Sequence, residues 1–161
     1  MSEAFMDVPC VLMNGERKAL ADFGARAVLV VNTASQCGFT PQYKGLEQLW
    51  QQWKSKGLLV IGFPCNQFGH QEPADDRQIA QFCDSSFGVS FPLCRKVEVN
   101  GDHAHRLFVA LKAAAPGLMG SQRIKWNFTK FLIDTRSGNV QRFAPFTKPE
   151  KLDAELARLL G

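Results

Sequence analysis

Residues 27–53 read AVLVVNTASQCGFTPQYKGLEQLWQQW, and the order of chemical types along this stretch decides the fold class. Ala27 to Asn32 is a continuous apolar run, which is typical of a strand buried on both faces. After Pro41 the large apolar residues recur at helical spacing, at Leu46, Leu49, Trp50 and Trp53. The stretch therefore predicts a buried strand, a loop that carries Cys37, and an amphipathic helix. Thr40 is expected to cap that helix, with Pro41 at its first position.

The rest of the chain also alternates between segments with the pattern of strands and segments with the pattern of helices. A second continuous apolar run, GLLVIGF at 57–63, predicts another buried strand, and Asn14-Gly15 predicts a hairpin turn near the N-terminus. Asp75 and Gln78 have the spacing of a capping box, and Ile79, Phe82 and Cys83 share one face of the helix that follows. Further elements are expected as a short strand at 97–99, a helix at 103–114, a hairpin of 128–134 with 140–144, and a closing helix.

This order predicts one α/β domain over residues 1–161 with a thioredoxin-like fold. Its parts are an N-terminal β-hairpin and a central mixed β-sheet flanked by helices on both faces. A chain of 161 residues that is 45% hydrophobic and 21% charged suits one domain with a real core. The N-terminal MSEAFMDVPC lacks the apolar run of a secretory signal, and no run approaches the roughly 20 residues of a membrane span. We therefore expect a cytoplasmic protein without integral membrane association.

The net charge of +4 is modest, but it is uneven. Residues 121–148 contain six Lys and Arg against one Asp. This stretch is either a solvated basic surface or a positive field for an acidic partner. No recognised nucleic-acid-binding motif accompanies it, so we expect no nucleic-acid partner.

Five cysteines are present, at positions 10, 37, 65, 83 and 94. An odd number is a poor match for a secreted disulfide framework, and there is no C-x-x-C pair for a zinc knuckle or dithiol motif. The H-x-H of His103 and His105 has no further ligand at suitable spacing, which favours a helix start over a metal site. The cysteines are therefore expected to act as individual thiols, structural or reactive.

Cys37 has two local interpretations. A cysteine in a loop that leads into a helix meets free backbone N–H groups, which favour the thiolate, and such thiolates titrate at roughly 3.5–7.5. Small neighbours, Ala34, Ser35 and Gly38, would let a substrate approach. The alternative is an inert buried cysteine, which is common. Position after the first strand of a βα unit favours the reactive interpretation, because ligands gather at the carboxyl ends of such strands.

Five segments together resemble the glutathione peroxidase family. They are NTASQCGFT (32–40), GFPCNQFGHQEP (62–73), FCDSSFGVSFPL (82–93), VNG (99–101) and KWNFTKFLID (125–134). They occur in the family's order, and the resemblance covers nearly the whole chain. It implies a peroxidase in which Cys37 attacks the peroxide at the position that other members fill with selenocysteine. It also implies catalytic roles for Gln71, Trp126 and Asn127, whose N–H groups can polarise the peroxide.

Cys83 matches the resolving cysteine of the non-selenium, thioredoxin-dependent branch. A Cys37 sulfenic acid would then condense to a Cys37–Cys83 disulfide, which thioredoxin would reopen. Because Cys83 lies on an inward face, we expect its short helix to unwind partly before the two cysteines meet. Cys65 is interpreted as structural, and Cys10 and Cys94 as spectators or accidental disulfide partners.

The resemblance implies hydrogen peroxide and organic or lipid hydroperoxides as substrates, with no metal or organic cofactor. The short connection before KWNF lacks the insertion of tetrameric glutathione-using members, which implies a monomer. Basic Arg123, Lys125 and Lys130 near Trp126 are expected to support the thiolate and attract an acidic thioredoxin. A glutathione-dependent peroxidase stays open, although Cys83 and the missing insertion favour thioredoxin. A peroxide sensor that relays oxidation to a partner protein also stays open, since it would use the same two cysteines.

Overall fold

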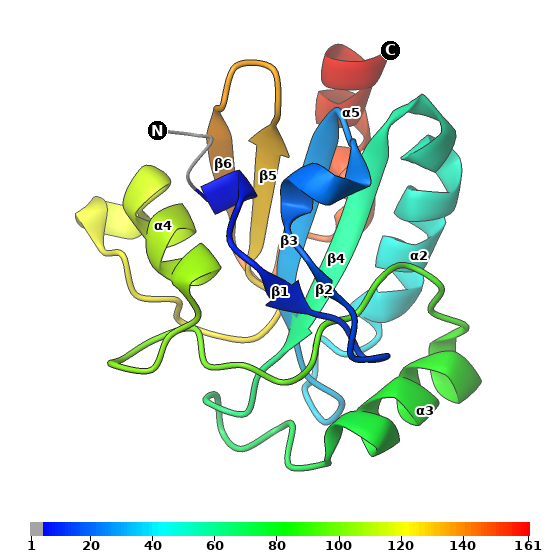
Figure 1. The fold of residues 1–161 in the computed structure, drawn as a ribbon, viewed down its shortest axis with the longest axis vertical. Helices are drawn as coiled ribbons and strands as arrows, with labels where there is room; N and C mark the ends of the chain where they lie inside the picture. Colours follow the sequence, from blue (N-terminus) through cyan, green and yellow to red (C-terminus); the bar gives the residue numbers. More distant parts are fainter. Residues whose placement is uncertain (1–4) are drawn as a thin grey trace.

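A four-stranded mixed sheet forms the centre of the computed structural model, which describes residues 5–161 (Figure 1). Its strands are β3 (Ala27–Thr33), β4 (Leu58–Pro64), β5 (Lys130–Asp134) and β6 (Val140–Phe143), in the order β4-β3-β5-β6. β3 runs parallel to β4 and antiparallel to β5, and β5 runs antiparallel to β6. Residues 1–4 of the expected domain, which include the start of the N-terminus where no secretory signal is expected, lie outside the described residues.

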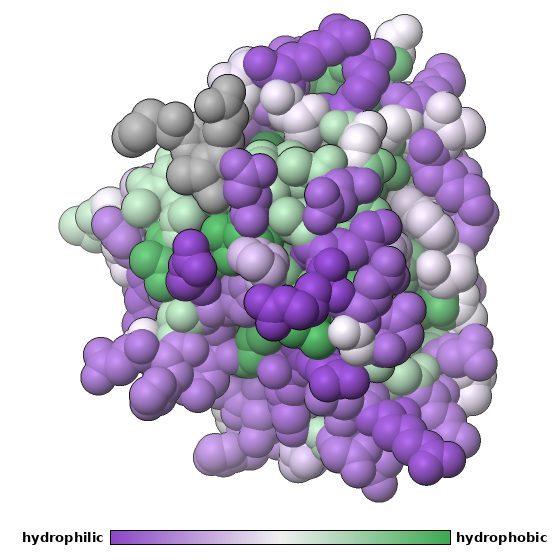
Figure 2. All heavy atoms as spheres, viewed as in Figure 1, coloured by the Kyte–Doolittle hydropathy of each residue, from purple (hydrophilic) through white to green (hydrophobic). Residues whose placement is uncertain are grey.

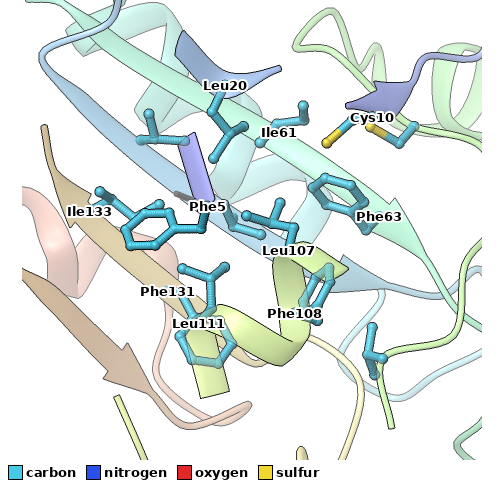
Figure 3. Packing of buried hydrophobic residues seen from close by; sticks show 14 of the residues in the cluster. Phe5, Cys10, Leu20, Ile61, Phe63, Leu107, Phe108, Leu111, Phe131 and Ile133 are labelled. Carbon is cyan, nitrogen blue, oxygen red and sulfur yellow. The ribbon is translucent and has the colours of Figure 1, made fainter. Parts of the chain in front are cut away.

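Side chains of β3 alternate between two cores, so the strand is buried on both faces as its sequence predicts. Val28 and Val30 join one cluster, which includes Leu107, Phe108 and Leu111 of α4 (Arg106–Ala114). Figure 3 shows this cluster, with aromatic and aliphatic side chains of α4 packed toward the strands. Leu29 and Val31 join the second cluster on the opposite face.

The second cluster is covered by three helices: α2 (Gln42–Trp53), α3 (Asp76–Phe87) and α5 (Asp153–Leu160). Short 3₁₀ turns complete the architecture, at η1 (Leu20–Phe23), η2 (Lys54–Lys56), η3 (Leu118–Gly120) and η4 (Pro149–Leu152). The prediction of a mixed sheet with helices on both faces is confirmed. The surface over one face of the molecule is largely hydrophilic, with small apolar areas between polar side chains (Figure 2).

The predicted N-terminal hairpin is also confirmed. β1 (Cys10–Val11) pairs antiparallel with β2 (Arg17–Lys18), and the turn between them contains Asn14 and Gly15. Gly15 adopts a φ of +89°, a left-handed conformation that glycine accepts without strain. In Figure 1 the hairpin crosses in front of the central sheet.

Two local predictions are wrong for the same reason: side chains satisfy backbone groups that were expected to bond within regular structure. The short strand expected at 97–99 does not form, because the Val99 amide donates to Gln67 Oε1 (2.7 Å) and the Val99 carbonyl accepts from Lys112. The helix expected from His103 begins at Arg106. His105 caps it, since its Nδ1 accepts from the Leu107 amide at 3.1 Å.

Thr40 does not cap α2, contrary to the sequence prediction. The helix begins at Gln42 after Pro41, and no side chain caps it. The Thr40 hydroxyl instead accepts from the Cys37 amide at 2.9 Å and donates to the Ala34 carbonyl at 2.8 Å. The amides of the first helical turn bond to carbonyls of the preceding turns, at Phe39, Thr40 and Pro41. Thr40 therefore holds the loop around Cys37 together rather than starting the helix.

Lys130 is the clearest correction among the charged residues. It was expected on a basic face near Trp126, yet it is fully buried. Its Nζ donates to the carbonyls of Pro145 (2.9 Å), Ala144 (3.4 Å) and Thr147, and burial lowers its pKa to about 7. Lys130 therefore anchors the segment after β6 to the sheet and cannot attract a partner protein.

Replacing Lys130 with methionine keeps most of the side-chain volume but removes the donor to three carbonyls. We expect Lys130→Met to lower the free energy of unfolding by about 1–3 kcal/mol, the cost of leaving buried polar groups unpaired. Urea unfolding measures this. The exposed Lys125→Met is the control, with an expected change within about 0.5 kcal/mol. Equal effects of the two substitutions would contradict the anchoring role.

Candidate active site

Cys37 lies in the loop between β3 and α2, at the carboxyl end of the parallel strand pair. Its side chain is only 7% exposed and belongs to the core cluster under α2. The Sγ atom accepts a hydrogen bond from the Phe39 amide at 3.3 Å. The amide that faces the sulfur thus belongs to the turn, and α2 begins only five positions later. The amide donor that was expected from a helix end therefore comes from this turn.

Gln71 is held beside the Cys37 loop through the backbone. The Gln36 amide donates to the Gln71 carbonyl at 2.9 Å, which joins the residue before Cys37 to the loop after β4. The amide of Glu72, next in the chain, donates to Asn66 Oδ1 at 3.0 Å and fixes the same loop from within. Two loops that follow parallel strands are therefore locked together at one edge of the sheet.

Asn127 reaches the same place from the third strand. Because β5 is antiparallel to β3, the residues just before β5 lie at the edge where β3 ends. The Phe128 amide donates to the Asn32 carbonyl at 2.6 Å, and Asn127 Nδ2 donates to Gln71 Oε1 at 3.0 Å. Since Gln71 Oε1 accepts this bond, the Gln71 amino group stays available as a donor.

Trp126 packs against both core clusters and is partly buried. Its carbonyl accepts from Asn32 Nδ2 (3.2 Å) and from the Thr129 hydroxyl (2.9 Å), so its backbone is fixed to β3 and to the residue that precedes β5. Its ring lies 5.9 Å from that of Phe68. Gly69 comes so close that a Cβ there would lie 3.2 Å from the indole, and its φ of +64° also favours glycine. The structure thus groups the side chains of Gln71, Trp126 and Asn127 at the edge that carries the Cys37 loop.

Cys83 sits apart from this group, on the buried face of α3. It is 1% exposed and belongs to the same core cluster as Cys37, and both are free thiols. Burial raises its pKa to about 11; the Tyr43 hydroxyl opposes this rise, and the Glu72 carboxyl adds to it. The capping box predicted for α3 is confirmed: Asp75 Oδ1 accepts from the Gln78 amide (2.8 Å), and Gln78 Oε1 accepts from the Asp75 amide (3.1 Å).

Sequence reasoning missed a group of buried polar side chains, two of which, Tyr43 and Glu72, lie near Cys83. Tyr43 and Glu72 are fully buried, and their oxygens have no hydrogen-bond partner among the described residues. The same holds for the hydroxyls of Thr33 and Ser35 and for one oxygen each of Asn32 and Asn127. Burial raises the pKa of Glu72, while the nearby Ser35 and Lys96 lower it less strongly. A charged residue inside the quoted block GHQEP was the available signal for Glu72.

Comparison with known proteins identifies a family for this chain. The family model described as "Glutathione peroxidase" matches residues 5–112. The chain belongs to the glutathione peroxidase family, and it is a peroxidase. Of the curated relatives, "Glutathione peroxidase-like peroxiredoxin 2" of Saccharomyces cerevisiae is 48% identical over 161 residues, covering 100% of this chain and 99% of its own. "Hydroperoxy fatty acid reductase gpx1" of Synechocystis is 50% identical and is covered over 90% of its length, with 92% of this chain matched.

Solved structures agree with the family and the fold of this peroxidase. The crystal structure of T. cruzi GPX1 superposes with a TM-score of 0.76 at 36% identity, covering 95% of this chain and 94% of that one. A thioredoxin family thiol:disulfide interchange protein from Chlorobium tepidum superposes with a TM-score of 0.68 at 19% identity, covering 97% of each chain. The second likeness confirms the thioredoxin-like fold and nothing finer.

The remaining cysteines of this peroxidase lie on the other face of the sheet. Cys65 is fully buried, its thiol donates to Gln67 Oε1 at 3.5 Å, and burial raises its pKa. Cys10 and Cys94 belong to the same cluster as Cys65. Within residues 5–161 no three His, Cys, Asp or Glu side chains are grouped as metal ligands would be. Each helix in that range is too short or too polar to cross a lipid bilayer.

Glu72→Gln tests the buried carboxyl. Because burial raises the folded-state pKa of Glu72, the folded protein favours the protonated form. The wild type therefore keeps its full stability below the unfolded pKa of about 4.5 and loses part of it as the pH rises through the folded value. We expect Glu72→Gln to be more stable than wild type at pH 7.5, on the order of 1 kcal/mol, with a smaller difference at pH 4.

Thermal unfolding of both proteins at the two pH values measures that difference. Glu98→Gln, at an exposed carboxyl outside the cluster, serves as the control. A difference between Glu72→Gln and wild type that is the same at both pH values would show that Glu72 does not titrate with folding.

Proposed function

We propose that this peroxidase reduces hydroperoxides by attack of Cys37, with Gln71, Trp126 and Asn127 as donors and Cys83 as the resolving cysteine. The observation that carries the proposal is the linkage of three loops at one sheet edge. The backbone amide of Gln36 donates to the Gln71 carbonyl, and the side-chain amide of Asn127 donates to Gln71 Oε1. A thiol and several N–H donors on a fixed frame suit a reaction that develops charge on a leaving oxygen.

In the first step, the Cys37 thiolate attacks one oxygen of the peroxide and breaks the O–O bond. The other oxygen leaves as water or an alcohol after it takes a proton, and Cys37 becomes a sulfenic acid. The Phe39 amide, which already donates to Sγ, stabilises the attacking thiolate. The free amino group of Gln71 and the N–H groups of Trp126 and Asn127 stabilise the leaving oxygen. Neutral donors suit this role because they add no competing nucleophile.

In the second step, the Cys83 sulfur attacks the Cys37 sulfenic acid, a disulfide forms, and the hydroxyl leaves as water. Both thiols are buried, and α3 holds Cys83 in a helix with a side-chain cap at its start. A helix of 12 residues is marginal without tertiary contacts, so we propose that α3 unwinds partly to deliver Cys83. Cys83 then leaves the apolar site that disfavours its thiolate.

Thioredoxin is the proposed reductant of the Cys37–Cys83 disulfide. Arg123 and Lys125 are exposed beside Trp126 and give that face a positive charge for an acidic partner, without Lys130. Unwinding of α3 would also present the disulfide to a protein thiol. We further propose that the peroxidase acts as a monomer in the cytoplasm and needs no metal or organic cofactor, because the two cysteines supply the redox chemistry.

Hydrogen peroxide and organic or lipid hydroperoxides are the proposed substrates. A cleft of about 370 Å³ adjoins the Cys37 loop, and its lining includes Gly38, Phe39, Gln42, Phe146 and Lys148. Apolar rings beside a lysine suit an organic chain that ends in a polar group. The name of the Synechocystis relative, a hydroperoxy fatty acid reductase, supports the same substrate class.

Turnover measured with two reductant systems tests the cycle. We expect consumption of hydrogen peroxide with thioredoxin, its reductase and NADPH to exceed that with glutathione and its reductase. Cys37→Ser removes the nucleophile and should abolish turnover with both. Cys83→Ser should form the sulfenic acid once, which dimedone labelling detects, and then turn over at least about tenfold more slowly with thioredoxin.

Cys65→Ser is the matched control, since Cys65 is equally buried but has no role in the cycle, and it should keep wild-type turnover. Full thioredoxin-supported turnover in Cys83→Ser would rule out the resolving role. Faster turnover with glutathione would favour the glutathione-dependent alternative. A stable mixed disulfide with a protein other than thioredoxin would favour the sensor.

The pH dependence of disulfide formation tests whether α3 unwinds first. Buried Cys83 has a pKa of about 11, whereas an exposed cysteine thiol has a pKa of about 8.5. If unwinding precedes attack, the rate should rise with pH and level off near 8.5–9. Rapid quenching with a thiol alkylating reagent measures the rate between pH 6 and 11. A rate that keeps rising beyond pH 10 would mean that Cys83 ionises in its buried position.

A further inference from the structure

Cys10 and Cys94 form a pair of buried thiols that the peroxidase cycle does not use. Cys10 lies in β1, and Cys94 lies in the extended segment after α3. They are 0% and 1% exposed, and both are free thiols. Figure 3 shows Cys10 at the edge of the first core cluster, close to Ile61 and Phe63.

The backbone sets the two cysteines side by side. Leu12 lies opposite Cys94 in an antiparallel bridge. The Met13 amide donates to the Leu93 carbonyl (3.0 Å), and the Arg95 amide donates to the Val11 carbonyl (2.9 Å). These bonds flank the bridge, so Leu12 and Cys94 are a non-hydrogen-bonded pair, the type in which side chains come closest.

Cys10 precedes Leu12 by two positions and therefore points to the same face as Leu12 and Cys94. It is the diagonal neighbour of Cys94 across the two strands, a placement in which side chains still reach each other. The Cys10 thiol donates to the Val8 carbonyl at 3.6 Å, which leaves its sulfur free to accept from Cys94. The neighbouring Cys94 side chain lowers the pKa of Cys10, the Cys10 side chain raises that of Cys94, and burial raises both. One member of the pair is thus favoured as the thiolate and the other as the proton donor.

We propose that Cys10 and Cys94 form a second disulfide when the protein is exposed to hydroperoxide. One thiol attacks the peroxide and becomes a sulfenic acid, while the other peroxide oxygen leaves as water or an alcohol. The second thiol then attacks the sulfenic sulfur, the S–S bond forms, and water leaves. Two thiols lose two electrons and two protons in total, and one peroxide is reduced. This inference does not depend on the cycle assigned to Cys37.

The oxidant reaches the pair through local opening of the hairpin. β1 and β2 each contain two residues, so few hydrogen bonds hold them to each other. Short paired elements of this kind open at low free energy, while the central strands stay closed. Cys94 is held more firmly, because its amide donates to the Gly62 carbonyl of β4 at 2.8 Å. Opening must also break the two backbone bonds that join the β1 segment to Leu93 and Arg95, and departure of β1 then uncovers both sulfurs.

The disulfide would tie the N-terminal hairpin to the chain just beyond α3. It would join positions 84 apart in the sequence (94 − 10), which is a long loop to close in the unfolded chain. The cross-link acts on the opposite face of the sheet from Cys37 and Cys83, which belong to the other core cluster. It would stabilise the oxidised protein without joining the catalytic cysteines.

Peptide mapping of the full-length wild-type protein tests the inference. The reduced protein is treated with increasing hydrogen peroxide, free thiols are alkylated, and the protein is digested with chymotrypsin. This enzyme cuts after Phe87 and so separates Cys83 from Cys94, which trypsin would leave in one peptide. We expect a linked peptide pair that contains Cys10 and Cys94. We also expect the melting temperature of the oxidised Cys37→Ser protein to exceed that of its reduced form by on the order of 10 °C.

Cys65 is the internal control. It is buried in the same cluster, but its thiol bonds to Gln67 and has no cysteine partner, so it should stay alkylatable. Adding Cys94→Ala to the Cys37→Ser protein should abolish both the linked peptide and the rise in melting temperature. The proposal would be overturned if Cys10 and Cys94 stayed unlinked at peroxide doses that fully oxidise Cys37 of the wild type. Linkage of either one to Cys65 instead would also overturn it.

Discussion

The hydrogen bond from the Gln36 amide to the Gln71 carbonyl is the contact on which the candidate site depends. It joins the loop after β3 to the loop after β4, and the parallel pairing of these strands brings the loops to one edge. β5 then adds Trp126 and Asn127 at that edge, because it runs the opposite way. The proposed nucleophile and its proposed donors therefore come from three separate loops, and no single loop has to fold into the candidate site by itself.

The position of Cys83 shows a conflict between stability and reaction. Burial on α3 contributes to the core, but it also raises the pKa of the thiol to about 11 and keeps it in a helix. The capping box of Asp75 and Gln78 strengthens the same helix. The interior around it contains unpaired polar oxygens of Tyr43 and Glu72, which lower the cost of opening this region compared with a fully apolar core. The helix that we propose to move thus packs over an interior in which buried polar oxygens lack hydrogen bonds.

Much of the fold could be predicted from short-range patterns. The continuous apolar runs of β3 and β4 and the spacing of Leu46, Leu49 and Trp53 are local, as is the Asp75–Gln78 box. The errors arose where a side chain bonds to a distant or unexpected backbone group. Lys130 looks like a surface charge in the sequence, and only the carbonyls of the segment after β6 explain its burial. Thr40 has the residue type of a cap, yet its hydroxyl is used by the Cys37 loop.

Some residues of the candidate site could be predicted from the sequence, and others could not. Cys37, Gln71, Trp126 and Asn127 were predicted through the resemblance of matched segments, and local patterns alone left Cys37 ambiguous. Glu72 and Tyr43 were missed because burial without a partner is a property of three-dimensional packing. The placement of Cys10 beside Cys94 could not be predicted for the same reason, since no local pattern links positions so far apart.

The flanks of α3 are tied down more firmly than its middle. On one side, Asp76 accepts from the Lys96 amide (2.8 Å), and Lys96 Nζ donates to the Ala74 carbonyl (2.6 Å). On the other side, Glu47 of α2 accepts from the amides of Ser90 (2.8 Å) and Phe91 (3.3 Å). An unwound α3 would therefore be a tether fixed at both ends. The concentration of Cys83 around Cys37 would be set by the length of that tether, so disulfide formation would be first order and independent of dilution.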